Sequence, residues 1–339
     1  MQQKVSVIIP CRNEKKYISR CLDSILNNKY ESIEIIVVDG ASEDGTREIL
    51  ESYQQRYNNI RIYTNTRKIT PVSMNTGVKN ATGDYIMIAG AHSSFPPGYI
   101  SGLINFLGEH PDAAGAGGIM KTVSEDSSAS QHIQKVLSDN FGVGNSLFRI
   151  GSRVSVKVDT LPFGIYHKSV YNKAGLYNER LIRNQDIEWS KRVLKTAGNL
   201  YLVPSVKCYY YFRSNFIHLA RSGFKNGCWN VLTTYITKNV ASLSLRHFIP
   251  LLFILSIVLP LVAAIVLPVF AWIAIVVFAI YLILMLWRSL YLSGRRWETP
   301  LILWSFIVLH FSYGTGSLVG LFSVKHLFKN NKPSKVKAE

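Results

Sequence analysis

The turn from Asp39 to Thr46 carries the densest polar chemistry in the sequence, with three carboxylates, two glycines and two hydroxyls. It follows an apolar, β-branched run, so Asp39 stands at the end of a predicted strand. An aspartate there can accept hydrogen bonds from the N–H groups of a nucleotide base or from a ribose hydroxyl, and glycines let the backbone approach a ligand closely. The same residues are also ordinary turn and capping signals. Both interpretations stay open at this point.

A second candidate lies at residues 84–94, where the apolar run Tyr85–Ala89 stops abruptly at small and polar residues. This pattern predicts a buried central strand. Ligands in open α/β sheets bind beyond the carboxyl ends of the strands, which places Gly90, Ala91 and His92 where chemistry would occur. The alternative is a strand followed by a loop whose glycine merely turns the chain.

The elements that must position these residues alternate between strands and helices. The strands are predicted at Val5–Pro10, Ile33–Val38 and Ile60–Tyr63, and each is followed by apolar residues at helical spacing. Successive strand–helix units imply a parallel sheet with right-handed crossovers, so roughly the first 95 residues predict a doubly wound α/β nucleotide-binding half. No Gly-x-Gly-x-x-Gly or Gly-Lys-Ser/Thr occurs, which disfavours a dinucleotide fold and a phosphate-binding P-loop.

Composition divides the chain into a soluble head and a membrane tail. Phe248–Trp287 and Leu301–Phe322 contain no charged residue, and both exceed the roughly 18 apolar residues that indicate a membrane span. Residues 1–247 alternate charged and apolar segments, as soluble domains do. The opening residues form too short an apolar run for a signal peptide, so we expect the head to stay in the cytosol.

The head is strongly basic. Of the formal net charge of +17, residues 248–339 hold eight basic and two acidic residues, a balance of +6, which leaves +11 for the head. Such a charge suits an anionic membrane or a phosphorylated substrate, and no nucleic-acid motif is present. The four cysteines are scattered without Cys-x-x-Cys spacing, so neither a disulfide framework nor a zinc site is indicated.

Several motifs together carry a resemblance to a known family. They are Val5–Glu14, Val37–Thr46, Ala81–Ile86, Gly115–Gly118, Pro162–Gly164, Gly175–Glu179 and Asn184–Glu188. In combination they resemble the family 2 glycosyltransferases of GT-A fold over roughly residues 4–235. The membrane tail adds a similarity to the subgroup that extends lipid-linked sugars in bacterial exopolysaccharide assembly, of the succinoglycan type.

The resemblance implies a donor site around the first motifs. The residues expected to contact the nucleotide are Pro10, Arg12, Asn13, Glu14, Asp39, Asp44, Gly90 and Ala91. The family's metal motif, Asp-x-Asp, falls on Gly90-Ala-His92, so its first aspartate is missing and His92 is expected to contact a metal ion or the pyrophosphate. We expect a weak divalent site that favours Mn²⁺ over Mg²⁺, because imidazole suits Mn²⁺ better. In the alternative, basic groups such as Arg12 or Arg221 offset the charge of the leaving diphosphate.

The resemblance places catalysis at the acidic pair that opens a predicted helix, Trp189–Leu194. Asp186 matches the general base, which takes the proton of the acceptor hydroxyl as the sugar is attacked. Glu188 is the second candidate for this role or for an acceptor contact, and the helix dipole alone would also favour an acidic residue here. Arg213 and Arg221 are candidate pyrophosphate or acceptor contacts.

The predicted domains are a catalytic head at 1–210, amphipathic interface helices at 211–247, membrane segments at 248–324 and a basic tail at 325–339. Phe248–Trp287 is long enough for a helical hairpin that turns at Pro268. A third full crossing would put the basic tail outside, so we favour two crossings over three.

The leading hypothesis is an inverting glycosyltransferase of the bacterial plasma membrane, with its head in the cytosol, that moves a sugar from a nucleotide donor, UDP first, to a polyprenyl-phosphate-linked acceptor. The alternative is a non-catalytic membrane partner that binds nucleotide or glycan. A processive synthase is disfavoured because Gln-x-x-Arg-Trp is absent.

Overall fold

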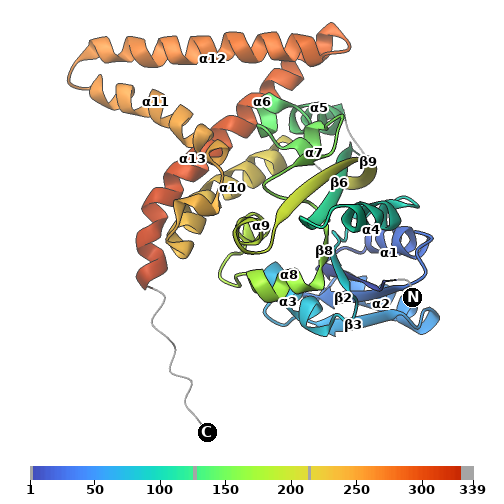
Figure 1. Cartoon of the computed structure of the whole chain (residues 1–339). Helices are drawn as coiled ribbons and strands as arrows, with labels where there is room; N and C mark the ends of the chain where they lie inside the picture. Colours follow the sequence, from blue (N-terminus) through green and yellow to red (C-terminus); the bar gives the residue numbers. More distant parts are fainter. Residues whose placement is uncertain (1–2, 125–127, 213–214, 330–339) are drawn as a thin grey trace. The chain divides into compact units, whose positions relative to one another are not determined.

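The computed structural model describes residues 3–124, 128–212 and 215–329. They fall into two compact units, the first made of residues 1–127 and 137–213, the second of residues 128–136 and 214–339. Figure 1 shows the elements of each. The predicted boundary at residue 210 lies close to this division, whereas the short segment 128–136 belongs with the second unit.

One mixed sheet organises the first unit. Its strands are β1 (Val5–Cys11), β2 (Ile33–Asp39), β3 (Ile60–Thr64), β4 (Tyr85–Ile88), β5 (Ser93–Ser94), β6 (Ala113–Ser124), β7 (Val156–Lys157), β8 (Ile165–His167) and β9 (Asn199–Phe212). The order is β3-β2-β1-β4-β8-β6-β9-β5, with β7 beside β9. The first four strands in this order are parallel, which confirms the predicted doubly wound beginning, and β8 then runs antiparallel to both β4 and β6.

Helices cover both faces of the sheet (Figure 1). One face carries α1 (Ile18–Leu26), α2 (Thr46–Arg56) and α4 (Tyr99–Glu109); the other carries α3 (Thr70–Asn80), α8 (Lys168–Ala174) and α9 (Gln185–Thr196). Alternation along β2 explains this division, because Ile35 and Val37 point into the first core and Ile36 and Val38 into the second. Two short helices, α6 (Asn140–Val143) and α7 (Leu147–Ile150), complete the unit.

The second unit is helical. Its α-helices are α5 (Ser128–Leu137), α10 (Phe216–Thr237), α11 (Ile249–Ala263), α12 (Ala271–Leu292) and α13 (Thr299–Lys329). The last residue of α5, Leu137, is counted with the first unit. The 3₁₀ turns are η1 (Val240–Ser242), η2 (Leu245–Phe248), η3 (Pro268–Phe270) and η4 (Arg296–Glu298). Three segments are long and apolar enough to cross a membrane: Leu245–Ala263, Pro268–Leu292 and Arg296–Ser323. The turn at Pro268 is confirmed. The third segment is a continuous helix, and the number of crossings stays a prediction.

Small residues let α10 and α13 approach closely. A Cβ at Gly227 of α10 would collide with the backbone oxygen of Tyr313, and one at Gly316 of α13 would collide with the backbone oxygen of Phe224. The buried Asn230 side chain donates a hydrogen bond to the Tyr313 hydroxyl at 2.6 Å. Glycine-mediated contact of this kind is typical of membrane helix pairs. The predicted interface helix therefore buries one face against α13, although its Arg221 and Lys225 side chains are exposed.

We expect Gly227→Val to lower the free energy of unfolding of the second unit by about 1–3 kcal/mol, because a side chain forces the two backbones apart. Thermal unfolding of the full chain in detergent measures this. Gly108→Ala is the matched control, since a Cβ at that helical position meets no atom within 4 Å and should be neutral or stabilising. Equal unfolding temperatures for the two variants would contradict the close packing.

Candidate functional site

A pocket of about 290 Å³ opens at the edge of the sheet where β1, β2 and β4 end. Its lining consists of Pro10, Cys11, Arg12, Glu14, Gly40, Lys68, Ile69, Thr70, Ser73, Met74, Ile88, Ala89, Gly90, Ala91, His92 and Phe163. The structure thus brings together six of the predicted site residues, Pro10, Arg12, Glu14, Gly90, Ala91 and His92. The carboxyl ends of parallel strands meet at one edge, which is why these distant segments converge.

Three other predicted residues, Asn13, Asp39 and Asp44, do not line the pocket but tie its two loops together. Asp39 is buried and accepts hydrogen bonds from the Ser42 hydroxyl at 2.5 Å and the Ser42 N–H at 3.1 Å. Asn13 accepts from the Glu43 N–H at 2.9 Å, and its own N–H donates to the Ser42 hydroxyl. Asp44 accepts from the Lys15 N–H at 3.1 Å. These bonds hold the loop after β1 against the loop after β2.

The electrostatics of Asp44 reflect this role. Burial raises its pKa, but hydrogen bonds from the Thr46 hydroxyl and from the N–H groups of Lys15 and Thr46 outweigh burial, so the pKa is lowered. The carboxylate therefore stays ionised and anchored in the loop at neutral pH.

His92 is held by Glu14. Its Nδ1 lies 3.0 Å from Glu14 Oε1, and both side chains are partly exposed, at 32% and 21%. A carboxylate only accepts, so Nδ1 donates to Glu14, and in the neutral ring Nε2 is then the acceptor or ligand atom. The ring also contacts Tyr210 in an edge-on arrangement, with 4.8 Å between the centroids. Glu14, the predicted nucleotide contact, and His92, the predicted metal contact, are thus directly linked.

Phe163 fills the space beside Gly90. A Cβ at Gly90 would lie 2.7 Å from Cε1 and 2.9 Å from Cζ of the Phe163 ring. Phe163 has a left-handed φ of 50°, which is strained for an aromatic residue. The Tyr99 hydroxyl donates to its carbonyl at 3.0 Å, and Phe95 packs edge-on against its ring. The ring is thus fixed by the core where a side chain at position 90 would begin.

Lys68 and Phe163 are pocket residues that sequence reasoning missed. Lys68 also has a left-handed φ, 58°, and its Nζ lies 3.0 Å from Glu43 Oε1. This hydrogen bond and the charges of Lys68 and Arg12 lower the pKa of Glu43. The available signals were a basic residue just before a helix start and the aromatic residue inside the Pro162–Gly164 motif, and neither specifies a pocket.

Asp186 lies in the first turn of α9, apart from the residues that line the pocket. Its side chain is solvent-accessible. Partial removal from bulk water nevertheless raises its pKa, against the lowering effect of its own N–H and that of Ile187. Its charge also adds to the effect of burial in raising the pKa values of Tyr166 and Tyr177. An accessible carboxylate with a raised pKa is suited to accept a proton.

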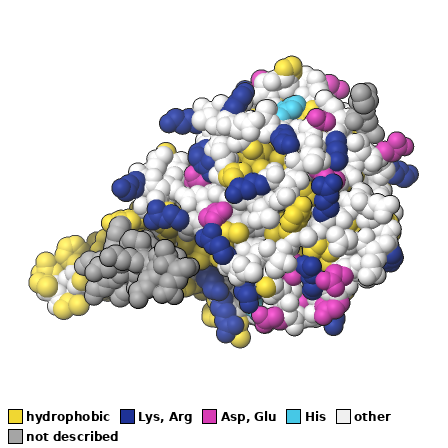
Figure 2. Space-filling model, turned by 90° about the horizontal axis from the view of Figure 1, so that it is seen from below, with side chains coloured by type: hydrophobic (Ala, Val, Ile, Leu, Met, Phe, Trp, Pro, Cys, Tyr) yellow, Lys and Arg dark blue, Asp and Glu magenta, His cyan; other side chains and the backbone are white. Residues whose placement is uncertain are grey.

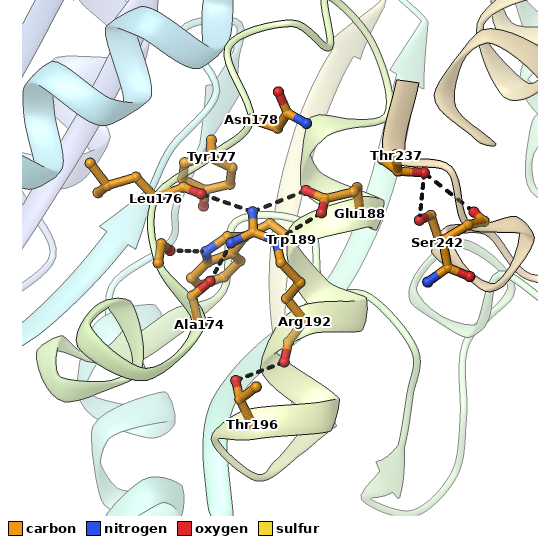
Figure 3. Close-up of polar contacts among 12 residues, drawn as sticks. Ala174, Leu176, Tyr177, Asn178, Glu188, Trp189, Arg192, Thr196, Thr237 and Ser242 are labelled. Carbon is orange, nitrogen blue, oxygen red and sulfur yellow. Dashed lines mark hydrogen bonds and ion pairs between the residues drawn. The ribbon is translucent and has the colours of Figure 1, made fainter. Parts of the chain in front are cut away.

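Arg192 braces the start of this helix (Figure 3). Its guanidinium pairs with the buried Glu188 carboxylate at 2.8 and 3.0 Å. It also donates to the carbonyl oxygens of Ala174 and Leu176, and the Trp189 indole N–H donates to the Gly175 carbonyl at 2.8 Å. The carboxylate of Glu188 is therefore engaged with Arg192, which favours Asp186 as the base.

The two remaining predicted residues are placed differently. Arg221 is exposed on α10 in the second unit. Arg213 lies outside the described residues. Their predicted contacts with pyrophosphate or acceptor stay predictions.

Comparison with known sequences decides the family. The family described as "Glycosyl transferase family 2" matches residues 6–177 of the 339. The chain belongs to glycosyl transferase family 2.

The chain is similar to a protein named as a transferase and to one named for succinoglycan biosynthesis. A Methanococcus voltae protein named dolichyl N-acetyl-alpha-D-glucosaminyl phosphate 3-beta-D-2,3-diacetamido-2,3-dideoxy-beta-D-glucuronosyltransferase is 34% identical over 62% of this chain and 68% of its own length. The succinoglycan biosynthesis protein ExoA of Rhizobium meliloti is 23% identical over 72% of this chain and 74% of its own. The expected resemblance is thereby confirmed.

A solved structure supports the GT-A fold. The crystal structure of GalNAc-T7 with UDP, GalNAc and Mn²⁺ superposes with a TM-score of 0.50 at 14% identity, over 62% of this chain and 44% of that one. At this identity the likeness shows the fold alone. The predicted α/β class with a GT-A head is confirmed.

The residues present do not fit the family's Asp-x-Asp metal motif. The place of a first carboxylate is taken by the Phe163 ring, and His92 with Glu14 supplies one imidazole nitrogen and one carboxylate. Within the part of the chain that the structure describes, no group of three or more His, Cys, Asp or Glu side chains could hold a metal ion. A hard divalent cation prefers more oxygen ligands than this set offers.

We expect Arg192→Ala to lower the free energy of unfolding by about 3 kcal/mol, because it leaves the buried Glu188 carboxylate without its counterion. Chemical denaturation of the full chain, followed by near-UV circular dichroism, to which Trp189 and the tyrosines packed around it contribute, measures the change. Lys195→Ala, an exposed substitution in the last turn of the same helix, is the control and should shift stability by less than about 0.5 kcal/mol. Similar losses of stability in both variants would contradict a stabilising role for the Arg192–Glu188 ion pair.

Proposed function

We propose that the protein is an inverting glycosyltransferase that transfers a sugar from a nucleotide-sugar donor to a polyprenyl-phosphate-linked acceptor. The observation that carries this proposal is Asp186, an accessible carboxylate with a raised pKa in the first turn of α9, where the resemblance from sequence expects the general base. A base whose pKa lies closer to neutrality accepts a proton more effectively during attack. Asp186 would take the proton of the acceptor hydroxyl while the bond between the sugar and the diphosphate breaks.

The pocket supports donor binding. Arg12 and Lys68 lie on its lining with Glu14 as the single carboxylate there, so its charged groups favour an anionic ligand. Its volume of about 290 Å³ suits a base and part of a nucleotide rather than a whole polymer. We propose UDP as the nucleotide to test first. Basic side chains are also spread over the face of the molecule in Figure 2, in keeping with the positive head.

The membrane segments support a lipid-linked acceptor. The Methanococcus voltae relative is named for a dolichyl-phosphate-linked sugar, and ExoA for succinoglycan biosynthesis. The hairpin of α11 and α12 has an uncharged tip, residues 264–270, whereas Arg246, Arg288 and Arg295 lie toward its other end. The positive-inside tendency then supports a cytosolic head, and we propose the plasma membrane of a bacterium as the location.

A non-catalytic partner that only binds nucleotide or glycan is the second candidate. Gly90 favours it, because a carboxylate of the metal motif is missing. Donor turnover by the purified protein discriminates the two, since a binding module would retain nucleotide affinity without hydrolysis or transfer.

Asp186→Asn should lower transfer at least about 10²-fold without loss of nucleotide binding, because it removes the proton acceptor. Transfer of radiolabelled sugar to a polyprenyl-diphosphate-sugar acceptor measures this. In the wild type, transfer should fall on acidification at a higher pH than an ordinary aspartate would give, because the pKa of Asp186 is raised. Near-normal turnover by the variant would exclude Asp186 as the base.

Stability supplies the control for Asp186→Asn. A carboxyl whose pKa is raised by folding contributes stability that is fully present below its unfolded pKa and is lost as the pH rises through the folded pKa. In its ionised form the group therefore opposes folding. The variant should unfold at the same or a higher temperature than the wild type at pH 7, which separates lost chemistry from lost structure.

Asp39→Ala should weaken nucleotide binding about tenfold, because it removes an acceptor for the base or ribose. The carboxylate also accepts bonds from Ser42, so Ser42→Ala is the matched control that loosens the loop and leaves Asp39 in place. Calorimetric titration with UDP measures both. Equal losses would mean that Asp39 acts only by holding the loop.

A further inference from the structure

The pocket and the helix that carries Asp186 are separate parts of the first unit. Asp186 lies in the first turn of α9 and does not line the pocket. Transfer nevertheless requires the base, the acceptor and the donor sugar to meet, and a displacement of about 1 Å can lower a rate about 10²-fold. The contacts that join the pocket wall to α9 therefore bear on the proposed reaction.

Asn75 of α3 makes the first of these contacts. It directly follows Ser73 and Met74, which line the pocket, and it is only 3% exposed. Its Oδ1 accepts the Tyr177 N–H and its Nδ2 donates to the Tyr177 carbonyl, both at 2.9 Å. Nδ2 also donates to Glu179 Oε1 at 3.1 Å. The amide thus uses its oxygen and both of its N–H groups on the segment between α8 and α9.

Glu179 makes the second contact. One oxygen of its carboxylate accepts the bond from Asn75, and the other pairs with Arg67, the chain neighbour of the pocket residue Lys68. The hydrogen bond from Asn75 and the pairing with Arg67 lower the pKa of Glu179, so the carboxylate is ionised at neutral pH. Arg67 is exposed, and an exposed ion pair adds little to stability. Its effect is therefore expected on position rather than on folding.

The segment between α8 and α9 also contacts α9 itself. The Tyr177 ring packs on the Trp189 ring with 4.9 Å between the centroids, and both residues are buried (Figure 3). The Trp189 N–H donates to the Gly175 carbonyl at 2.8 Å. Asp186 lies three residues before Trp189 on this helix. Direct contacts through Asn75, Tyr177 and Trp189 therefore join the pocket wall to the helix of the base.

We propose that Asn75 and Glu179 are positioning residues, which hold α9, and with it Asp186, in place relative to the nucleotide in the pocket. Neither of them lines the pocket. Asn75 acts through the backbone of Tyr177, and Glu179 acts through Asn75 and Arg67. The inference rests on the proposed function, because it takes the pocket as the nucleotide site and Asp186 as the base.

The pocket wall has hydrogen bonds of its own that do not involve Glu179. The Asn65 side chain donates to the Ile69 carbonyl at 2.8 Å and to the Ser73 hydroxyl at 2.9 Å. Its N–H donates to the Asp39 carbonyl at 2.7 Å. Loss of Glu179 should therefore leave the nucleotide site nearly intact and loosen the segment that leads to α9.

The experiment uses the full chain in detergent and has one readout that needs no catalysis. Hydrogen–deuterium exchange of residues 175–192, with and without UDP or GDP, measures whether the pocket is coupled to α9. In the wild type, the nucleotide that binds should slow exchange of this segment about fivefold or more. In Glu179→Ala the slowing should be lost, although calorimetric affinity for the same nucleotide changes less than about threefold.

Steady-state transfer gives the second readout, with UDP-glucose, UDP-N-acetylglucosamine and GDP-mannose as donors and a polyprenyl-diphosphate-linked sugar as acceptor. Glu179→Ala should lower kcat at least about tenfold and change the donor KM less than about threefold. Asn75→Ala should give the same division between kcat and KM. Arg67→Ala combined with Glu179→Ala should lose no more than Glu179→Ala alone, because both remove the same contact.

Two further variants separate positioning from folding. Glu179→Gln keeps an oxygen that can accept from Asn75 and loses the charge pair with Arg67, so it should retain more of kcat than Glu179→Ala. It also serves as the test variant if the alanine change disturbs folding. Glu51→Ala is the matched control, since Glu51 pairs with Arg47 at 2.7 Å in another exposed ion pair on α2 and should change neither readout.

Wild-type kcat in Glu179→Ala, or slowing of exchange by nucleotide that persists in it, would overturn the inference and leave the proposed function standing. A loss of nucleotide affinity as large as the loss of kcat would also overturn it, because Glu179 would then serve the pocket alone. Slowing that depends on Glu179 without any turnover of donor would support the link to α9 and refute the proposed function. If neither UDP nor GDP binds, the proposed function and the inference fail together.

Discussion

The pocket depends on how the loops after β1 and β2 satisfy their own backbone groups. Asn13 and Ala41 adopt left-handed conformations, with φ of 56° and 54°, which turn peptide groups toward the facing loop. The side chains of Asn13, Asp39 and Asp44 accept or share the hydrogen bonds that these groups need. The Glu14 N–H donates to the Thr46 hydroxyl in the same network. The position of the Glu14 carboxylate, which contacts His92, therefore depends on this network.

Local pattern predicted most of the first unit, because a buried parallel strand and an amphipathic helix each leave a periodic trace in sequence. It also predicted the edge where chemistry would gather. It could not predict how each polar residue there is used, since an aspartate at a strand end can serve its own loop or a ligand, and spacing is the same in both cases. Lys68 and Phe163 were missed because tertiary contacts and left-handed backbone, not local pattern, bring them into the pocket.

Helix α10 is a second case in which local sequence pattern did not predict a tertiary contact. Its interleaved aromatic and basic residues predicted a helix in the headgroup layer. Gly223 and Gly227, one turn apart, were the signal for a different contact, because they form a smooth face on which α13 lies. The two interpretations concern different faces of one helix, and the exposed Arg221 and Lys225 still suit an interface. The composition of α10 reflects all of its faces, whereas its packing against α13 depends only on the face that carries Gly223 and Gly227.

Two residues near the proposed site are held in energetically unfavourable states, and neighbouring residues stabilise them there. The raised pKa of Asp186 means that its ionised form opposes folding, and the left-handed Phe163 is strained where it stands. Each is braced by groups outside the pocket: Arg192 ties α9 to the preceding loop, and Tyr99 binds the Phe163 carbonyl. A carboxylate relieved by a nearby cation would be a weaker base. Arg192 pairs with Glu188 and not with Asp186, which is the arrangement that the proposed base requires.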